Sequence, residues 1–176
     1  MGQIMQFSAP PPDYPETTDA LDLSERVFLL AVRWWVAAQQ RGRDPLSHMR
    51  VTLDSIGAEA AALPLNRFMT VASHSTSRRV VTYCPCSPHV GTDEKHLLYP
   101  ASLVQKGEIE LAARVLQTTI LTEEGAVLAL GPLEEIGERL ARARLLFRLR
   151  QAPSAESTFP PTVESWISAL SGTTLH

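Results

Sequence analysis

The chain has 176 residues, of which 44% are hydrophobic and 20% charged, and its formal net charge at pH 7 is −3. This length suits one domain with a substantial core, and the hydrophobic content excludes a wholly disordered chain. The charge excludes a domain-wide electrostatic attraction to nucleic acid. Aromatic residues make up only 6%, while Ala, Leu and Arg are frequent. These side chains lose little rotamer freedom in a helix, so the composition favours helices over sheet.

The cysteines and the apolar segments bear on the compartment. Two cysteines separated by one residue cannot form a disulfide framework, and residues 1–6 lack the basic and apolar regions of a secretory signal. The longest apolar run, Val27 to Ala38, is interrupted by Arg33 and falls short of the about 20 residues that span a bilayer. We therefore expect a cytoplasmic protein that does not enter a membrane and keeps its thiols reduced.

Composition divides the chain into three parts. Residues 1–19 are rich in proline and small polar residues and predict a flexible arm. Residues 20–151 carry the periodic apolar patterns of packed helices. Residues 152–176 predict a linker followed by a short amphipathic helix. The expected fold class is all-α: an irregular bundle of six or seven helices with a proline-rich N-terminal arm and a tethered C-terminal helix.

The first two helices have clear start and stop signals. Asp22 and Glu25 form the pattern of a capping box, and the helix that follows them should end at Gly42, which tolerates a left-handed backbone. Asp44 and Pro45 then start a second helix as its cap and first residue. We expect that helix to continue to residue 63.

The middle of the chain predicts three more helices and one extended segment. Pro64 should start a short third helix. Residues 79–83 have the β-branched and aromatic character of a strand, but no partner strand is evident, so they predict an extended connector. Apolar spacing then predicts helices over residues 92–106 and 108–121.

The last part of the domain predicts a short helix over residues 126–130 and then a long one. The long helix should begin at Pro132 and continue to Arg150. Its buried face repeats every three or four residues: Leu133, Ile136, Leu140, Ala143 and Phe147.

The same segment carries a cluster of basic residues, namely Arg139, Arg142, Arg144, Arg148 and Arg150. On a helix they would flank both sides of the apolar face instead of forming one basic stripe. A helix that reads a DNA groove presents its basic side chains together. DNA binding through the Arg139–Arg150 helix is therefore kept as a further alternative, and nucleic acid is not the partner we expect.

The segment around the two cysteines concentrates the residues that could bind metal or undergo redox chemistry. Cys84, Cys86 and His89 could supply three ligands to zinc, and His96 or the more distant His74 a fourth. The single residue between the cysteines is one fewer than structural zinc sites usually have.

Two other interpretations of this segment remain open. One cysteine could be a reactive thiol, activated by the N-terminus of the following helix. Alternatively, Pro85 and Pro88 stiffen a connector in which the cysteines act as small apolar residues. In either case no cofactor is needed.

No pattern in the sequence predicts catalysis. There is no G-x-S-x-G elbow, no phosphate-binding glycine loop and no Walker lysine. The adjacent pair Asp93 and Glu94 is typical of a helix N-terminus rather than of acid–base work. We therefore expect a protein that is not an enzyme, with no catalytic or cofactor-binding residues.

A surface for a partner protein gives the first functional hypothesis. Leu145 and Leu149 should project opposite the buried face of the long helix. Trp166, Ile167 and Leu170 form one face of the C-terminal helix, which could cover that surface or dock into a groove on a partner. We expect a regulatory or adaptor protein that binds another protein or a second copy of itself. A metal- or thiol-dependent sensor centred on Cys84-Pro85-Cys86 is the alternative.

Overall fold

The computed structural model describes residues 10–154 and 164–165. Within them the chain forms an all-α bundle, as the sequence predicts. The helices are α1 (Leu23–Gln40), α2 (Pro45–Asp54), α3 (Ala62–His74), α4 (Thr92–Gln105), α5 (Ile109–Thr119) and α6 (Glu123–Arg142). Two 3-10 turns, η1 (Thr18–Ala20) and η2 (Glu59–Ala61), and two short strands, β1 (Val81–Thr82) and β2 (Glu164–Ser165), complete the described elements. None of the described helices is both long and apolar enough to cross a membrane.

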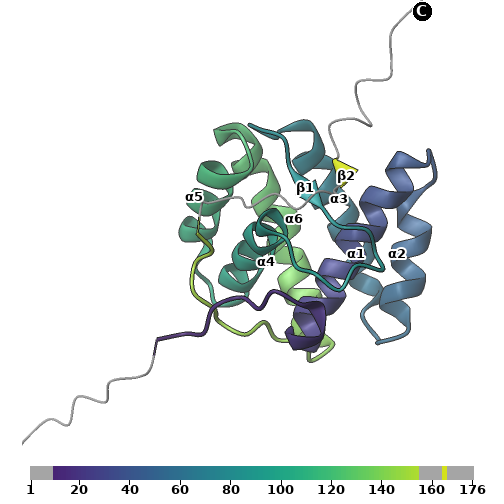
Figure 1. The fold of residues 1–176 in the computed structure, drawn as a ribbon, viewed down its shortest axis with the longest axis horizontal. Coiled ribbons are helices and arrows are strands. Elements are labelled where there is room, and N and C mark those ends of the chain that lie inside the picture. Colours follow the sequence, from purple (N-terminus) through teal and green to yellow (C-terminus); the bar gives the residue numbers. More distant parts are fainter. Residues whose placement is uncertain (1–9, 155–163, 166–176) are drawn as a thin grey trace, which may run out of the picture.

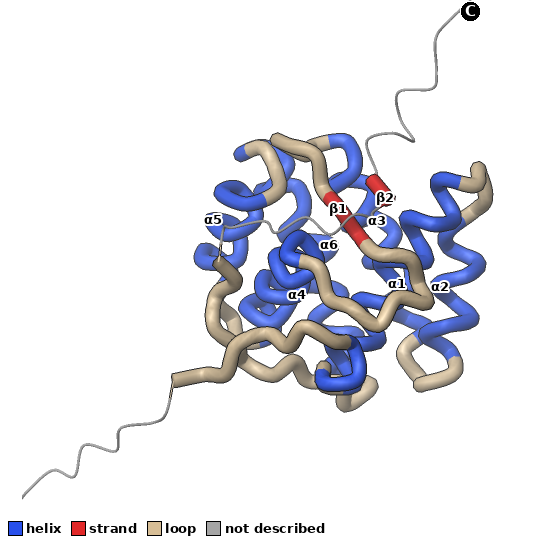
Figure 2. Tube along the Cα trace, viewed as in Figure 1, coloured by secondary structure: helices blue, strands red, loops and turns tan. Residues whose placement is uncertain are grey.

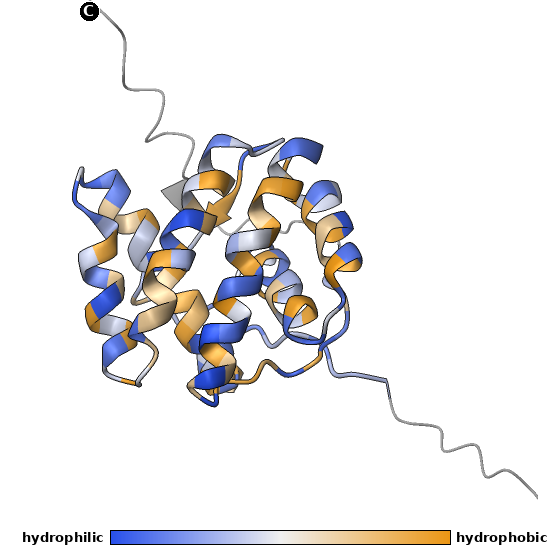
Figure 3. Ribbon diagram, turned by 180° about the vertical axis from the view of Figure 1, so that it is seen from behind, coloured by the Kyte–Doolittle hydropathy of each residue, from blue (hydrophilic) through white to orange (hydrophobic). Residues whose placement is uncertain are grey.

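The helices pack around one core. α3 lies along α6, α4 contacts both α5 and α6, and α1 contacts α2. Figure 3 shows hydrophobic and hydrophilic stretches alternating along the helices, as amphipathic helices require. The largest fully buried side chains come from five helices and include Phe28, Met49, Phe68, Leu98 and Leu116.

The second helix is shorter than predicted. α2 ends at Asp54, because Gly57 takes a left-handed φ of 71° and the amide of Ala58 donates back to the carbonyl of Leu53 (2.8 Å). This is the hydrogen bond of a glycine-dependent helix end. The sequence prediction treated that glycine as part of the helix.

A single helix, α6, replaces the two helices predicted around Pro132, which lies inside it. A proline in a helix removes one backbone hydrogen bond, and here the acceptor left without its donor is the carbonyl of Leu128. The side chain of Leu128 is exposed, so this turn faces water, which can bind the carbonyl. The proline is therefore tolerated without a break in the helix.

α6 also ends earlier than predicted. Its last residue is Arg142, because Arg144 has a φ of 61° and the amide of Leu145 donates to the carbonyl of Leu140 (2.8 Å). The chain leaves the helix there as an irregular segment. Phe147, predicted on the helix, reaches the core from this segment and packs edge-on against Phe28 at 5.8 Å.

β1 has a partner strand that the sequence did not reveal. Val81 lies opposite Ser165, and Thr82 lies opposite Glu164, in an antiparallel pair. The prediction of an unpaired connector is therefore wrong. The same pairing shows that Glu164–Ser165 are extended, although the sequence predicted a helix there. Trp166, Ile167 and Leu170 lie outside the described residues.

The proline-rich arm contacts the rest of the domain from residue 12 onward. The carbonyl of Pro12 accepts a hydrogen bond from the amide of Gln151 (3.0 Å), and Tyr14 is buried in the core. The expectation of a free arm over residues 1–19 therefore does not hold for its second half. Figure 2 shows the loop segments before α1 and after α6 near one another.

Candidate functional site

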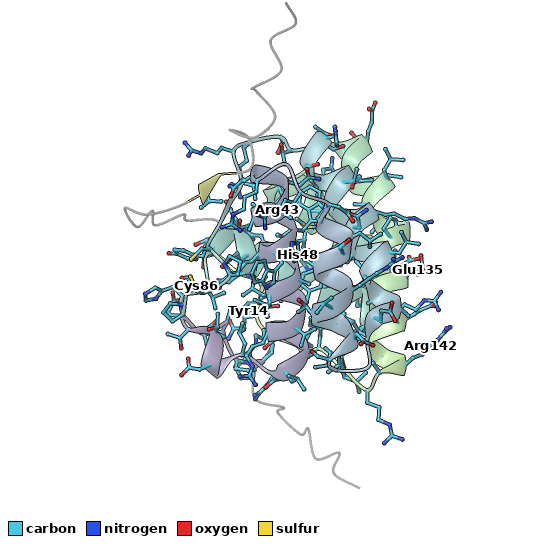
Figure 4. All side chains as sticks on the ribbon, turned by 90° about the vertical axis from the view of Figure 1, so that its right-hand side faces the viewer. Tyr14, Arg43, His48, Cys86, Glu135 and Arg142 are labelled. Carbon is cyan, nitrogen blue, oxygen red and sulfur yellow. The ribbon has the colours of Figure 1, made fainter. Side chains whose placement is uncertain are left out.

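The two cysteines lie on a tight turn. Cys84 to Ser87 form a β-turn, closed by a hydrogen bond from the amide of Ser87 to the carbonyl of Cys84 (3.0 Å). Pro85 occupies its second position, where a fixed φ favours the turn. Cys84 is half-buried and Cys86 is exposed, and both are free. Figure 4 shows Cys86 at one edge of the molecule.

The thiols touch. Their Sγ atoms are 3.0 Å apart. A disulfide needs about 2.05 Å between its sulfurs, and a tetrahedral zinc with Zn–S bonds of about 2.3 Å needs about 3.8 Å. The observed distance lies between these values, and either requires a shift of only about 1 Å. The pair is thus close to the geometry of a disulfide, which needs no further ligand.

A buried ion pair lies beneath the turn. Arg33 of α1 donates from Nε and Nη2 to the two carboxylate oxygens of Glu94 in α4 (2.7 and 2.8 Å), and both side chains are almost inaccessible to water. The same guanidinium donates to the carbonyls of Ser87 (2.8 Å) and His89. One side chain therefore fixes both the carboxylate and the chain just after the cysteines.

The two acidic residues at the start of α4 bind the chain just before the cysteines. Glu94 accepts from the amides of Tyr83 (2.9 Å) and Gly91 (2.8 Å). Asp93 accepts from the amide of Val81 (2.8 Å) and from Arg78. The sequence assigned these acids only a helix-dipole role, but their carboxylates also accept the backbone hydrogen bonds of Val81 and Tyr83.

Burial and hydrogen bonding act on Asp93 in opposite directions. Burial alone would raise the pKa of the carboxyl group, but nearby His96, Arg78 and the amide of Val81 together lower it below its usual value. His96 Nδ1 lies 4.0 Å from Asp93 Oδ1, which is too far for a hydrogen bond. The contact between His96 and Asp93 is therefore weaker than a hydrogen bond.

The outer edge of the cysteine segment binds residues near the N-terminus. The amide of Thr18 donates to the carbonyl of Pro88 (2.8 Å), and the amide of Val90 donates to the carbonyl of Glu16 (2.9 Å). Lys95 of α4 forms an ion pair with the exposed side chain of Glu16. The segment that the sequence predicts as an arm is therefore part of this site.

The contact between the thiols makes Cys86 less acidic. Hydrogen bonding to Cys84, together with the charge of its thiolate form, raises the pKa of the Cys86 thiol, and Arg33 opposes this shift weakly. Two neighbouring sulfurs resist carrying two negative charges. A negative charge on Cys84 therefore opposes ionisation of Cys86.

The four predicted zinc ligands do not converge. Within residues 10–154, no three His, Cys, Asp or Glu side chains are grouped so that they could hold a metal ion. Cys84, Cys86 and His89 lie on the surface segment, whereas His96 is buried with neither ring nitrogen hydrogen-bonded. Zinc binding by this set would require rearrangement and stays a prediction.

The arginine cluster does not form one surface. Arg150 is buried and binds Glu25 of α1 through Nε and Nη2, although the sequence placed it on a solvated helix flank. Arg139 and Arg142 form ion pairs along α6 with glutamates one turn earlier. Figure 4 shows Arg142 on the side of the molecule opposite Cys86.

Of the two leucines predicted to form an apolar surface, Leu145 and Leu149, only Leu149 is exposed. Leu145 is only 6% exposed and belongs to the core, because the helix that would have presented it ends at Arg142. Leu149 is 44% exposed, and its neighbour Leu146 is 67% exposed. The carbonyl of Leu146 accepts from Ser24 (2.8 Å), which places it near the start of α1.

Sequence reasoning missed the residues that organise the site, namely Arg33 and Glu94. A signal was available, because Arg33 is the only charged residue in the apolar run from Val27 to Ala38. A charge on a helix face that must be buried needs a buried partner. The sequence could not identify that partner, which lies 61 positions further along the chain.

Comparisons of the chain with protein-family models, with curated proteins and with solved structures find no match.

Proposed function

We propose that this chain is a non-enzymatic regulatory protein that senses thiol oxidation through Cys84 and Cys86. The observation that supports the proposal is the 3.0 Å approach of the two sulfurs on a turn that α1 and α4 hold in place. Cys86 is open to solvent, so a small oxidant can reach it. A structural pair of apolar cysteines would have no need of this exposure.

The chemistry is thiol–disulfide exchange with a low-molecular-weight disulfide. One thiolate of the pair attacks the small disulfide, forms a mixed disulfide and releases one small thiol. The second cysteine then attacks the sulfur of the first, closes the Cys84–Cys86 disulfide and releases the second small thiol. The protein loses two electrons and two protons, and both appear in the two small thiols. The reverse reaction resets the pair.

The test is to incubate the reduced protein with oxidised glutathione, acidify, alkylate the remaining thiols and measure intact mass. We expect a species two hydrogen masses lighter than the reduced chain, with no alkyl group added. The matched variant Cys86→Ser should stop at the mixed disulfide. If the wild type also stops there, or if both thiols stay alkylatable at high oxidant, the proposal is wrong.

A second candidate function, adaptor binding of a partner protein, is favoured by a different observation. Leu146 and Leu149 are exposed next to the start of α1, where Leu23 is 52% exposed. Exposed leucines that lie together are typical of contact surfaces. The variant Leu146→Ser with Leu149→Ser should keep the fold and reduce self-association in sedimentation experiments. Unchanged sedimentation would remove a second copy of the chain as the partner.

A further inference from the structure

We propose that oxidation of the Cys84–Cys86 pair loosens the docking of residues 16–18 on the cysteine segment, which makes this N-terminal stretch the output of the sensor. The inference rests on the proposed function, because it requires the disulfide to form. It adds the part of the molecule that responds.

Closing the disulfide must move the turn. The sulfurs have to approach from 3.0 Å to about 2.05 Å with a Cβ–S–S–Cβ dihedral of about 90°. Pro85 cannot adjust its φ, which its ring holds near about −65°. The adjustment therefore falls on Cys86 and on the chain that follows it.

The inner edge of the segment is held more firmly than the outer edge. Ser87 and His89 bind a guanidinium that is buried and paired with Glu94. Glu94 also holds the amides of Tyr83 and Gly91. Breaking a buried ion pair leaves an uncompensated charge and costs several times more than losing a neutral backbone hydrogen bond. The Arg33–Glu94 pair should therefore survive oxidation.

The outer edge has much weaker links. Two neutral backbone bonds, Thr18 to Pro88 and Val90 to Glu16, connect it to the N-terminal stretch. The ion pair of Lys95 with Glu16 involves a side chain that is 83% exposed and adds little. The strain of a closed disulfide should therefore be released here.

The opening should stay local. On one side of the stretch Tyr14 is buried, and on the other side Leu21 is buried, both in the main core. Residues between these two anchors can separate from the cysteine segment without unfolding the domain. The change exposes the backbone groups of Glu16 and Thr18, which are then free to bind another chain.

The test is residue-resolved amide hydrogen exchange by NMR on the full chain, reduced and then oxidised with glutathione disulfide. The two informative amides are those of Thr18 and Val90, since they donate the outer-edge bonds. We expect each to exchange about tenfold faster in the oxidised protein. The amides of Tyr83 and Gly91, which bind Glu94, serve as internal controls and should keep their rates.

The variant Cys84→Ser with Cys86→Ser is the matched control, and oxidant should leave its exchange rates unchanged. If the disulfide forms but Thr18 and Val90 exchange as before, the inference is wrong while the thiol sensor stands. If the amides of Tyr83 and Gly91 exchange faster instead, the strain is released at the inner edge of the segment and the inference is also wrong. If no disulfide forms, both proposals fall together.

Discussion

Two buried arginine–glutamate pairs hold irregular segments onto the same helix, α1, but they support different parts of the molecule. Arg33 binds Glu94 and fixes the cysteine segment. Glu25 binds Arg150 and fixes the stretch after α6, together with the carbonyl of Asp13. Both pairs are bidentate and almost fully buried.

The difference lies in what surrounds each pair. Arg150 sits in a segment outside the helices and stacks on the buried ring of Tyr14 (5.4 Å to its centroid), so this pair joins two stretches of loop to the bundle. Arg33 and Glu94 both project from helices, and the chain above them carries two touching thiols. The same buried chemistry thus serves attachment near the start of α1 and, further along the helix, supports the turn that carries the two thiols.

Replacing Arg33 by Leu should have the largest effect on stability. Glu94 would keep its two backbone donors but lose its counter-charge in a site almost inaccessible to solvent, which costs about 3–5 kcal/mol of unfolding free energy. Urea unfolding followed by circular dichroism measures it. The control Arg67→Leu removes an arginine that is 59% exposed and 3.8 Å from Glu135, and should cost under about 1 kcal/mol. Equal losses in the two variants would contradict the structure.

Replacing Arg150 by Leu should cost less than the about 3–5 kcal/mol typical of a broken buried pair. The segment that carries it can detach locally and let water reach Glu25. Amide exchange should accelerate at Gln151, whose amide binds Pro12, and stay unchanged at Tyr83 and Gly91. Faster exchange at those two amides would show that the two ion pairs are one cooperative unit.

Acid should destabilise the region around the cysteine segment by protonating Asp93. This effect should be smaller than those of the two arginine substitutions. Its pKa is lowered in the folded protein, so its contribution is complete above the unfolded value of about 3.9 and is lost as the pH falls through the lower folded value. The variant Asp93→Asn should therefore lose less stability than the wild type between about pH 5 and about pH 3. Parallel curves in urea unfolding at each pH would refute this role.

The smallest effect concerns thiol acidity. Because Cys84 raises the pKa of Cys86, the variant Cys84→Ala should shift the pH profile of Cys86 alkylation by iodoacetamide toward lower pH. The variant Cys84→Ser keeps a hydrogen-bonding group but has no second thiolate, so its pH profile should lie between those of the wild type and Cys84→Ala. A profile that does not move would show that the sulfurs are not in contact in solution.

The sequence was sufficient for the class of fold but not for all helix ends. α1 starts after Asp22, as its capping pattern predicts, because such signals are local. The ends of α2 and α6 depend on residues with a left-handed backbone conformation, Gly57 and Arg144. An arginine rarely adopts this conformation, so the sequence does not indicate it. The partner of β1 lies far along the chain, where no local pattern could indicate it.

The sequence singled out Cys84 and Cys86 as candidate site residues but did not identify the side chains that hold their turn. The spacing of Cys84 and Cys86 drew attention to the turn, and Pro85 explains its shape locally. The contacts that hold the flanking chain come from Arg33 of α1 and Glu94 of α4, which are far apart in the sequence. Leu145 shows the same limit, since its burial depends on where α6 ends.

The most direct test of the account is the equilibrium between dithiol and disulfide, measured against glutathione for the folded protein and for the same chain unfolded in urea. If the fold holds Cys84 and Cys86 close together, the folded protein should form the disulfide at a lower ratio of oxidised to reduced glutathione than the unfolded chain. A folded protein that resists oxidation as well as or better than the unfolded chain would contradict the claim that the fold prepares this pair to react.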